Sequence, residues 1–124
     1  MAGERILIVE DEYLIRATVS EMLEDHGYEV IAADNGEEAL DMLRSDGGVA
    51  ILITDMSLAG GMDGRTLAAA ARGLRGALPV IFMTGRPESI GPLDPATDAV
   101  VAKPYTSAEL VAAITKFLPP TSHQ

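Results

Sequence analysis

Ala50-Ile51-Leu52-Ile53-Thr54-Asp55 begins with four consecutive apolar residues and ends on a carboxylate. A strand with one face in water alternates apolar and polar residues, whereas an unbroken apolar run is typical of a strand covered on both faces. Similar runs stand at Ile6–Val9, Pro79–Met83 and Ala99–Ala102, and Tyr28–Ala33 alternates enough for a further strand. The sequence therefore predicts five strands of one sheet.

Helical patterns fill most of the intervals around these runs. The interval before Gly27 has an apolar face with the i, i+3, i+4 spacing of a helix, and Gly27 supplies a stop. Asn35 with Glu38 predicts a capping box for a helix that ends near Asp46. The face of the first predicted helix comprises Ile15, Thr18, Val19, Met22 and Leu23.

The second half of the chain continues this alternation with one interruption. An Ala-rich helix is predicted from about Arg65 to Leu74, with Asp63 as a capping residue before it. Thr106 with Glu109 predicts a capping box for a last helix that Pro119 and Pro120 stop. The interval from Thr84 to Thr97 admits at most a short turn, because prolines and glycines interrupt it at 87, 91, 92 and 95.

Strands that alternate with helices predict an α/β fold with a five-stranded parallel sheet, helices on both faces and a short or irregular fourth helix. The chain has 124 residues, 48% of them hydrophobic, which indicates one domain over residues 1–120 and a flexible tail over 121–124. The absence of cysteines fits a reducing compartment. We expect a cytoplasmic protein, because no run is long enough for a membrane span.

The net charge of −10 argues against nucleic acid and anionic membranes as partners. Within this acidic chain, Glu10, Asp11 and Asp55 each follow a predicted strand. Because the carboxyl ends of parallel strands meet at one edge, these three carboxylates should converge there and repel one another. Mg²⁺ fits such a cluster, since it is held by one or two carboxylates and keeps water and room for phosphate oxygens.

The same edge carries groups suited to phosphoryl transfer. Asp55 is a carboxylate nucleophile of the kind that forms aspartyl phosphates, and Lys103 is a point charge for a phosphoryl oxygen. The Thr84 hydroxyl and the backbone amides of Met56 and Gly85 are expected to add hydrogen bonds to the transferred group.

Five motifs stand in order along the chain, namely Ile6 to Glu12, Leu52 to Met56, Met62-Asp63-Gly64, Phe82 to Gly85 and Ala102 to Tyr105. Together they resemble the receiver domain of bacterial two-component response regulators, and the resemblance covers essentially the whole chain. It implies a flavodoxin-like sheet of order 2-1-3-4-5, Asp55 as phosphoacceptor, Thr84 as switch hydroxyl and Lys103 as phosphate-binding lysine. It also implies that Mg²⁺ is held by Glu10, Asp11, Asp55 and the backbone carbonyl of Ser57.

Two departures from the family pattern stand out. Val100 occupies the position, three residues before Lys103, where many receivers have a Tyr or Phe that swings inward on activation. The Pro- and Gly-rich interval after Thr84 replaces the regular fourth helix that many receivers use to dimerise. The run Phe82-Met83-Thr84-Gly85 is similar to a subgroup of stand-alone receivers with a Phe-x-x-Thr-Gly signature.

The resemblance implies a signalling protein with self-catalysed phosphotransfer and autodephosphorylation, and not a conventional enzyme. Its partners would be a histidine kinase or phosphotransfer protein and a downstream protein, with the chain a monomer or weak dimer. Tyr13 and Leu14 lie off the predicted core face beside the acidic edge, which favours a docking role. Two alternatives stay open, namely a small magnesium-dependent phosphatase with an aspartyl-phosphate intermediate and a phosphorylation-independent adaptor.

Overall fold

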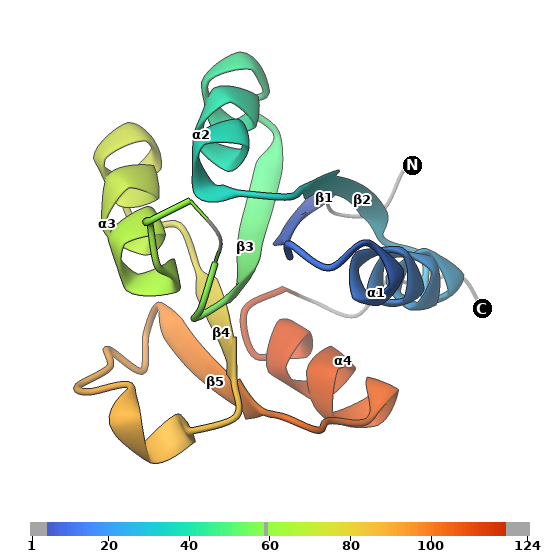
Figure 1. Cartoon of the computed structure of the whole chain (residues 1–124). Helices are drawn as coiled ribbons and strands as arrows, with labels where there is room; N and C mark the ends of the chain where they lie inside the picture. The colour runs from blue at the N-terminus through green and yellow to red at the C-terminus, as the bar shows by residue number, and fades with distance from the viewer. Residues whose placement is uncertain (1–4, 59, 119–124) are drawn as a thin grey trace.

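The computed structural model describes residues 5–58 and 60–118, which form one parallel five-stranded sheet with helices on both faces (Figure 1). The strand order is β2-β1-β3-β4-β5, which confirms the predicted fold class. The strands are β1 (Arg5–Val9), β2 (Glu29–Ala33), β3 (Val49–Asp55), β4 (Val80–Thr84) and β5 (Asp98–Ala102). The helices are α1 (Tyr13–Asp25), α2 (Gly36–Ser45), α3 (Gly64–Arg75) and α4 (Ser107–Thr115), with one 3₁₀ turn, η1 (Pro87–Ser89).

The unbroken apolar strands supply two cores, because successive side chains of a strand point to opposite faces. Ile6 and Ile8 of β1 pack in the core beneath α1 and α4, whereas Leu7 and Val9 pack in the core beneath α2 and α3. β3 repeats this division, so the run at 50–53 is buried on both sides, as its sequence predicts. The parallel pairing of the strands places their carboxyl ends at one edge of the sheet.

The predicted helix starts form, but the capping box predicted for Asn35 and Glu38 is incomplete, because the Glu38 side chain accepts the Asp34 amide at 2.9 Å instead of the Asn35 amide. The Asn35 side chain accepts the Glu38 amide at 2.8 Å, and the Asp63 side chain accepts the Thr66 amide at 2.8 Å. Thr106 and Glu109 form a complete capping box, with each side chain accepting the other residue's backbone amide. These contacts begin α2, α3 and α4 where the sequence indicates.

Two expectations about helices were wrong. Ile15, which is 37% exposed, and Thr18, which is also exposed, do not join the core, and Val19 and Leu23 are the buried residues of α1. The first turn of α1 is therefore left uncovered by the sheet. The last helix ends at Thr115, before the prolines, because the amides of Lys116 and Phe117 bond back only three residues, which tightens the chain into a turn.

The interval between β4 and β5 contains one short 3₁₀ turn, which confirms the irregular fourth helix. The predicted domain end at 120 and the tail at 121–124 lie outside the described residues. Within the described part of the chain, no helix is long and apolar enough to cross a bilayer.

Candidate functional site

The carboxyl edge of the sheet brings Asp55 and Lys103 into direct contact. Asp55 is the last residue of β3 and is 7% exposed, and Lys103 directly follows β5. The Lys103 Nζ lies 2.6 Å from Asp55 Oδ2, although the two residues are 48 positions apart. The backbone amide of Lys103 donates to the Thr84 carbonyl at 2.8 Å, so the lysine is anchored beside β4. The sheet thus places a cation on the proposed nucleophile.

Glu10 and Asp11 complete an acidic cluster with Asp55. One carboxylate oxygen from each residue lies within 4.8 Å of the other two. Glu10 is 2% exposed, and its Oε1 is buried with no hydrogen-bond partner, while its Oε2 accepts the Glu12 amide at 3.1 Å. A buried carboxylate oxygen without a partner is costly unless a ligand satisfies it. The cluster therefore fits a hard divalent cation such as Mg²⁺.

The environment of Glu10 disfavours its ionised form, compared with a carboxyl group in water. Burial raises the pKa of Glu10 to about 7, and the nearby Asp55 carboxylate adds to this shift. The Glu12 amide and Lys103 act in the opposite direction but do not outweigh burial. A divalent cation would reverse this balance, because it stabilises the ionised carboxylate.

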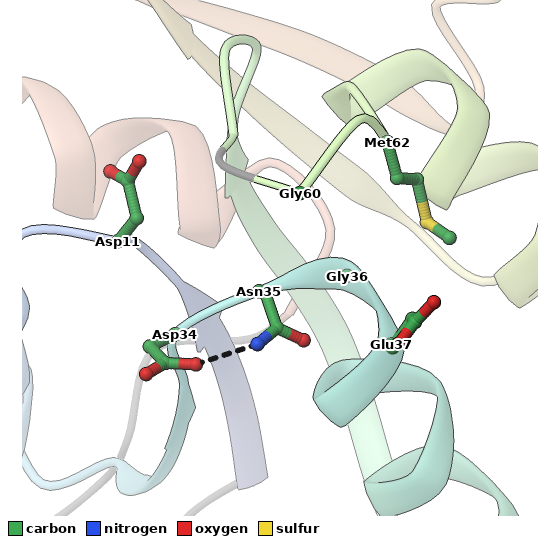
Figure 2. A pocket seen from close by; sticks show the side chains of 7 residues that line it. All are labelled: Asp11, Asp34, Asn35, Gly36, Glu37, Gly60 and Met62. Atoms are coloured by element: carbon green, nitrogen blue, oxygen red, sulfur yellow. Dashed lines mark hydrogen bonds between the residues drawn. The ribbon is translucent and has the colours of Figure 1, made fainter.

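Asp11 faces solvent beside a pocket of about 270 Å³ (Figure 2). The pocket lies between the β1–α1 loop, the start of α2 and the β3–α3 loop, with Met62 opposite Gly36. A side chain at Gly36 would collide with Met62, since an added Cβ would lie 2.5 Å from its Sδ. The open side at Asp11 matches a cation that keeps several of its waters.

Thr84 and the β3–α3 loop border the other side of Asp55. A cavity of about 350 Å³ lies there, and Ser57, Thr84 and Arg86 are among the residues that line it. The Thr84 Oγ1 accepts the Arg86 amide at 3.0 Å, so the hydroxyl proton stays available for a phosphoryl oxygen. The cavity therefore lies beside the Thr84 hydroxyl and the loop that follows Asp55.

The expected role of the Met56 amide was wrong. That N–H donates to the Met83 carbonyl at 2.9 Å, as part of the pairing between β3 and β4. The amide that faces the carboxylate belongs to Ser57, which donates to Asp55 Oδ1 at 3.2 Å. Sequence alone did not separate the two, because the register at the strand end decides which amide is used.

Two further observations refine the site. The acidic run at 10–12 is not the first turn of a helix, since α1 begins at Tyr13 and has no acid in its first turn. Tyr105, to which the sequence analysis assigned no role, is close enough to Glu10 and Asp55 for their charges to act on its hydroxyl group. Burial raises the pKa of Tyr105, and the carboxylates of Glu10 and Asp55 add to the rise.

Comparisons with known proteins point to one family. The family described as the response regulator receiver domain matches residues 6–115. The response regulator MprA of Mycobacterium tuberculosis is 34% identical over 111 residues, which cover 87% of this chain and 47% of that protein. The chain thus spans about half the length of the curated relatives it matches.

Solved structures agree in fold. The receiver domain of the hybrid histidine kinase CckA is 35% identical, with a TM-score of 0.79 over 92% of this chain and 98% of that one. The response regulator TrrA of Thermotoga maritima, solved in complex with Mg²⁺ and BeF, is 31% identical. Its TM-score is 0.81 over 93% of this chain and 99% of that one.

Proposed function

Because this chain belongs to the response regulator receiver domain family, the phosphoacceptor domains of two-component signalling, we propose that its phosphoacceptor is Asp55. The observation that carries the proposal is the 2.6 Å contact between Lys103 Nζ and Asp55 Oδ2 inside a cluster of three carboxylates. The donor is a phosphohistidine of a histidine kinase or phosphotransfer protein in the cytoplasm. The output is an altered interaction with a downstream protein.

The transfer step follows from the contacts of Asp55. A carboxylate oxygen of Asp55 attacks phosphorus, the P–N bond to the donor imidazole breaks, and the imidazole leaves with the bonding electrons. Lys103 then pairs with a phosphoryl oxygen, and Thr84 donates its hydroxyl proton to another. Water later attacks the phosphorus of the aspartyl phosphate, which releases inorganic phosphate and restores Asp55.

Glu10, Asp11, Asp55 and the backbone carbonyl of Ser57 are the proposed ligands of Mg²⁺. When bound, the cation neutralises the clustered carboxylates and the charge of the phosphoryl oxygens. The buried Oε1 of Glu10, which has no hydrogen-bond partner, supports this assignment. TrrA, solved with Mg²⁺ and BeF, is a relative of the same fold.

Incubation with acetyl phosphate and Mg²⁺ tests the proposed function directly. We expect one acid-labile phosphoryl group per chain, located on Asp55 by mass spectrometry of peptides. Many turnovers on small phosphoesters would instead indicate the phosphatase alternative, and the absence of any label would indicate the adaptor alternative.

The exposed first turn of α1 is the proposed surface for the phosphohistidine partner. Tyr13 and Leu14 are 68% and 76% exposed and directly precede Ile15, which is also exposed. Double substitution of Tyr13 and Leu14 by Ala should slow transfer from the kinase and leave labelling by acetyl phosphate unchanged. Leu74→Ala is a matched control, because Leu74 is an exposed leucine on α3. Equal loss with both donors would contradict the docking role.

Activation is proposed to reorder residues 85–97 instead of moving an aromatic side chain. Val100 stands at the aromatic position, and a β-branched residue is too short and too restricted at χ1 to fill space vacated by Thr84. Hydrogen exchange with and without Mg²⁺ and beryllium fluoride should change most between Gly85 and Thr97. Exchange that changes only in β5 and α4 would contradict this route.

A further inference from the structure

Two arginines of α3 are hydrogen-bonded to the chain between β4 and β5. Its residues 86–97, called the segment below, replace a regular fourth helix. Arg65 and Arg72 are seven residues apart, so they lie on the same side of α3. The Arg65 Nη1 donates to the Pro92 carbonyl at 3.0 Å, and its guanidinium lies 5.9 Å from the centre of the Phe82 ring. In Figure 1, α3 and the segment that precedes β5 lie one above the other at the left of the view.

Arg72 holds the far end of this segment. Its Nη2 donates to the Thr97 carbonyl at 3.0 Å and to Asp98 Oδ1 at 2.6 Å, and its Nε donates to the Leu78 carbonyl at 3.0 Å. The other oxygen of Asp98 accepts the Asp94 amide at 2.9 Å. Residues 92–98 are therefore bonded to α3 at both ends.

The start of α3 and the start of the segment both lie at the carboxyl edge of the sheet, where Asp55 ends β3. α3 begins at Gly64, where an added Cβ would lie 2.6 Å from the Asp55 carbonyl oxygen, and the Gly64 amide donates to the Met56 carbonyl at 2.8 Å. The segment begins after Thr84, whose hydroxyl accepts the Arg86 amide at 3.0 Å. A movement of Thr84 toward a phosphoryl group thus acts on a segment that is bonded directly to α3.

The two arginines differ in how easily their contacts are released. Arg72 pairs with Asp98, whose side chain is 8% exposed, and loss of that pair would leave a buried charge. Arg65 makes one hydrogen bond to a carbonyl in an exposed setting, where water can replace it at little cost. The hydrogen bond from Arg65 to the Pro92 carbonyl is therefore the contact that a change in the segment can break or reform.

We propose that Arg65 and Arg72 couple residues 86–97 to α3, so that phosphorylation of Asp55 changes α3 as well as the segment. The inference rests on the proposed function, because it takes phosphorylation of Asp55 as its trigger. Arg65 acts as a positioning residue. Through it, α3 joins the surface that changes on phosphorylation, in a protein where the segment replaces a regular fourth helix.

Hydrogen exchange of the full chain, with and without Mg²⁺ and beryllium fluoride, tests the coupling. In the wild type, amides of 86–97 and of α3 should change in the same direction. In Arg65→Gln the response of the segment should remain and the response of α3 should be clearly weakened, with only the Arg72 contacts left to carry it. Arg65→Lys, which keeps a charged donor, should restore part of the α3 response. Arg75→Gln is the matched control, since Arg75 is on the same helix but donates to the Val49 carbonyl of β3.

Each outcome decides a separate question when labelling by acetyl phosphate is measured on the same samples. A response of α3 that persists unchanged in Arg65→Gln, or that is lost equally in Arg75→Gln, would overturn the coupling. A wild type that is labelled on Asp55 but shows no response in α3 would also overturn it. Absence of label on Asp55 would overturn the proposed function itself.

Discussion

Two ion pairs at opposite edges of the sheet have the same length but different surroundings. Lys103 Nζ lies 2.6 Å from Asp55 Oδ2 at the carboxyl edge, and Arg72 Nη2 lies 2.6 Å from Asp98 Oδ1 where β5 begins. The two acids are similarly buried, with side chains 11% and 8% exposed. Length and burial alone therefore do not identify the reactive pair.

The partners around each pair make the difference. Asp98 accepts hydrogen bonds from Arg72, from the Asp94 amide and from Thr97, and Arg72 is also bonded to two backbone carbonyls. Asp55 instead lies beside two further carboxylates and is held by a lysine, which is a compact charge on a flexible stem. The first pair locks β5 to α3, whereas the second leaves an acid that can exchange partners.

Substitution of Asp55 and of Asp98 should give the largest difference between the two ion pairs, and the difference is in phosphoryl labelling. Asp55→Asn should abolish acid-labile labelling by acetyl phosphate, because an amide is neither a nucleophile nor a comparable Mg²⁺ ligand. Asp98→Asn, assayed below its melting temperature, should keep one label per chain. Undiminished labelling of Asp55→Asn would move the acceptor to another residue.

Substitution of Arg72 and of Lys103 should change the stability of the protein in different ways. Arg72→Met should lower the free energy of unfolding by about 3 kcal/mol, the lower end for a buried pair, because 27% of the Arg72 side chain is exposed. Lys103→Met should also destabilise the metal-free protein, but Mg²⁺ should restore it by neutralising Asp55. Urea unfolding with and without Mg²⁺ measures both effects, and equal rescue of the two variants would contradict the comparison.

Mg²⁺ should stabilise the folded protein only by binding to the carboxylates at the carboxyl edge of the sheet. Each tenfold excess of free Mg²⁺ over its dissociation constant should add about 1.4 kcal/mol to the stability of the wild type. Asp55→Asn should lose most of this gain, and should itself be more stable than the wild type without metal, because one of three repelling carboxylates is removed. A wild-type melting temperature indifferent to Mg²⁺, or a gain abolished by Asp98→Asn, would contradict the acidic site.

The pH dependence of metal-free stability should have opposite signs at the two edges of the sheet. The pKa of Glu10 is raised from 4.5 to about 7, so its contribution to stability is full below pH 4.5 and is lost as pH rises through about 7. For Asp98, burial opposes ionisation, but bonds from the Asp94 amide and Arg72 lower its pKa below 3.8. Its contribution is full above pH 3.8 and is lost as pH falls.

Urea unfolding of metal-free variants across pH checks this prediction. Glu10→Gln should flatten the decline between pH 4.5 and about pH 7, the two pKa values of Glu10. Asp98→Asn should change only the acid limb of the curve. A decline between pH 4.5 and about pH 7 that persists in Glu10→Gln would assign the decline to another group.

The order of elements and their caps was readable from the sequence, because it depends on neighbours along the chain. Unbroken apolar runs predicted the buried strands, and Asn35, Asp63 and Thr106 predicted helix starts. Glu10, Asp11 and Asp55 were also expected together, since parallel strands end at one edge. The prolines and glycines of 85–97 excluded a regular helix there.

Contacts between distant residues were decided only by the tertiary structure. The burial of Glu10 Oε1 and the use of the Ser57 amide instead of that of Met56 depend on the pairing of strands at their last residues. Ile15 fits the helical period but is exposed, because a period specifies a face of the helix and not how far the sheet extends beneath it. The Arg72–Asp98 pair joins residues 26 positions apart, and no local pattern encodes which arginine a packed helix turns toward a buried acid.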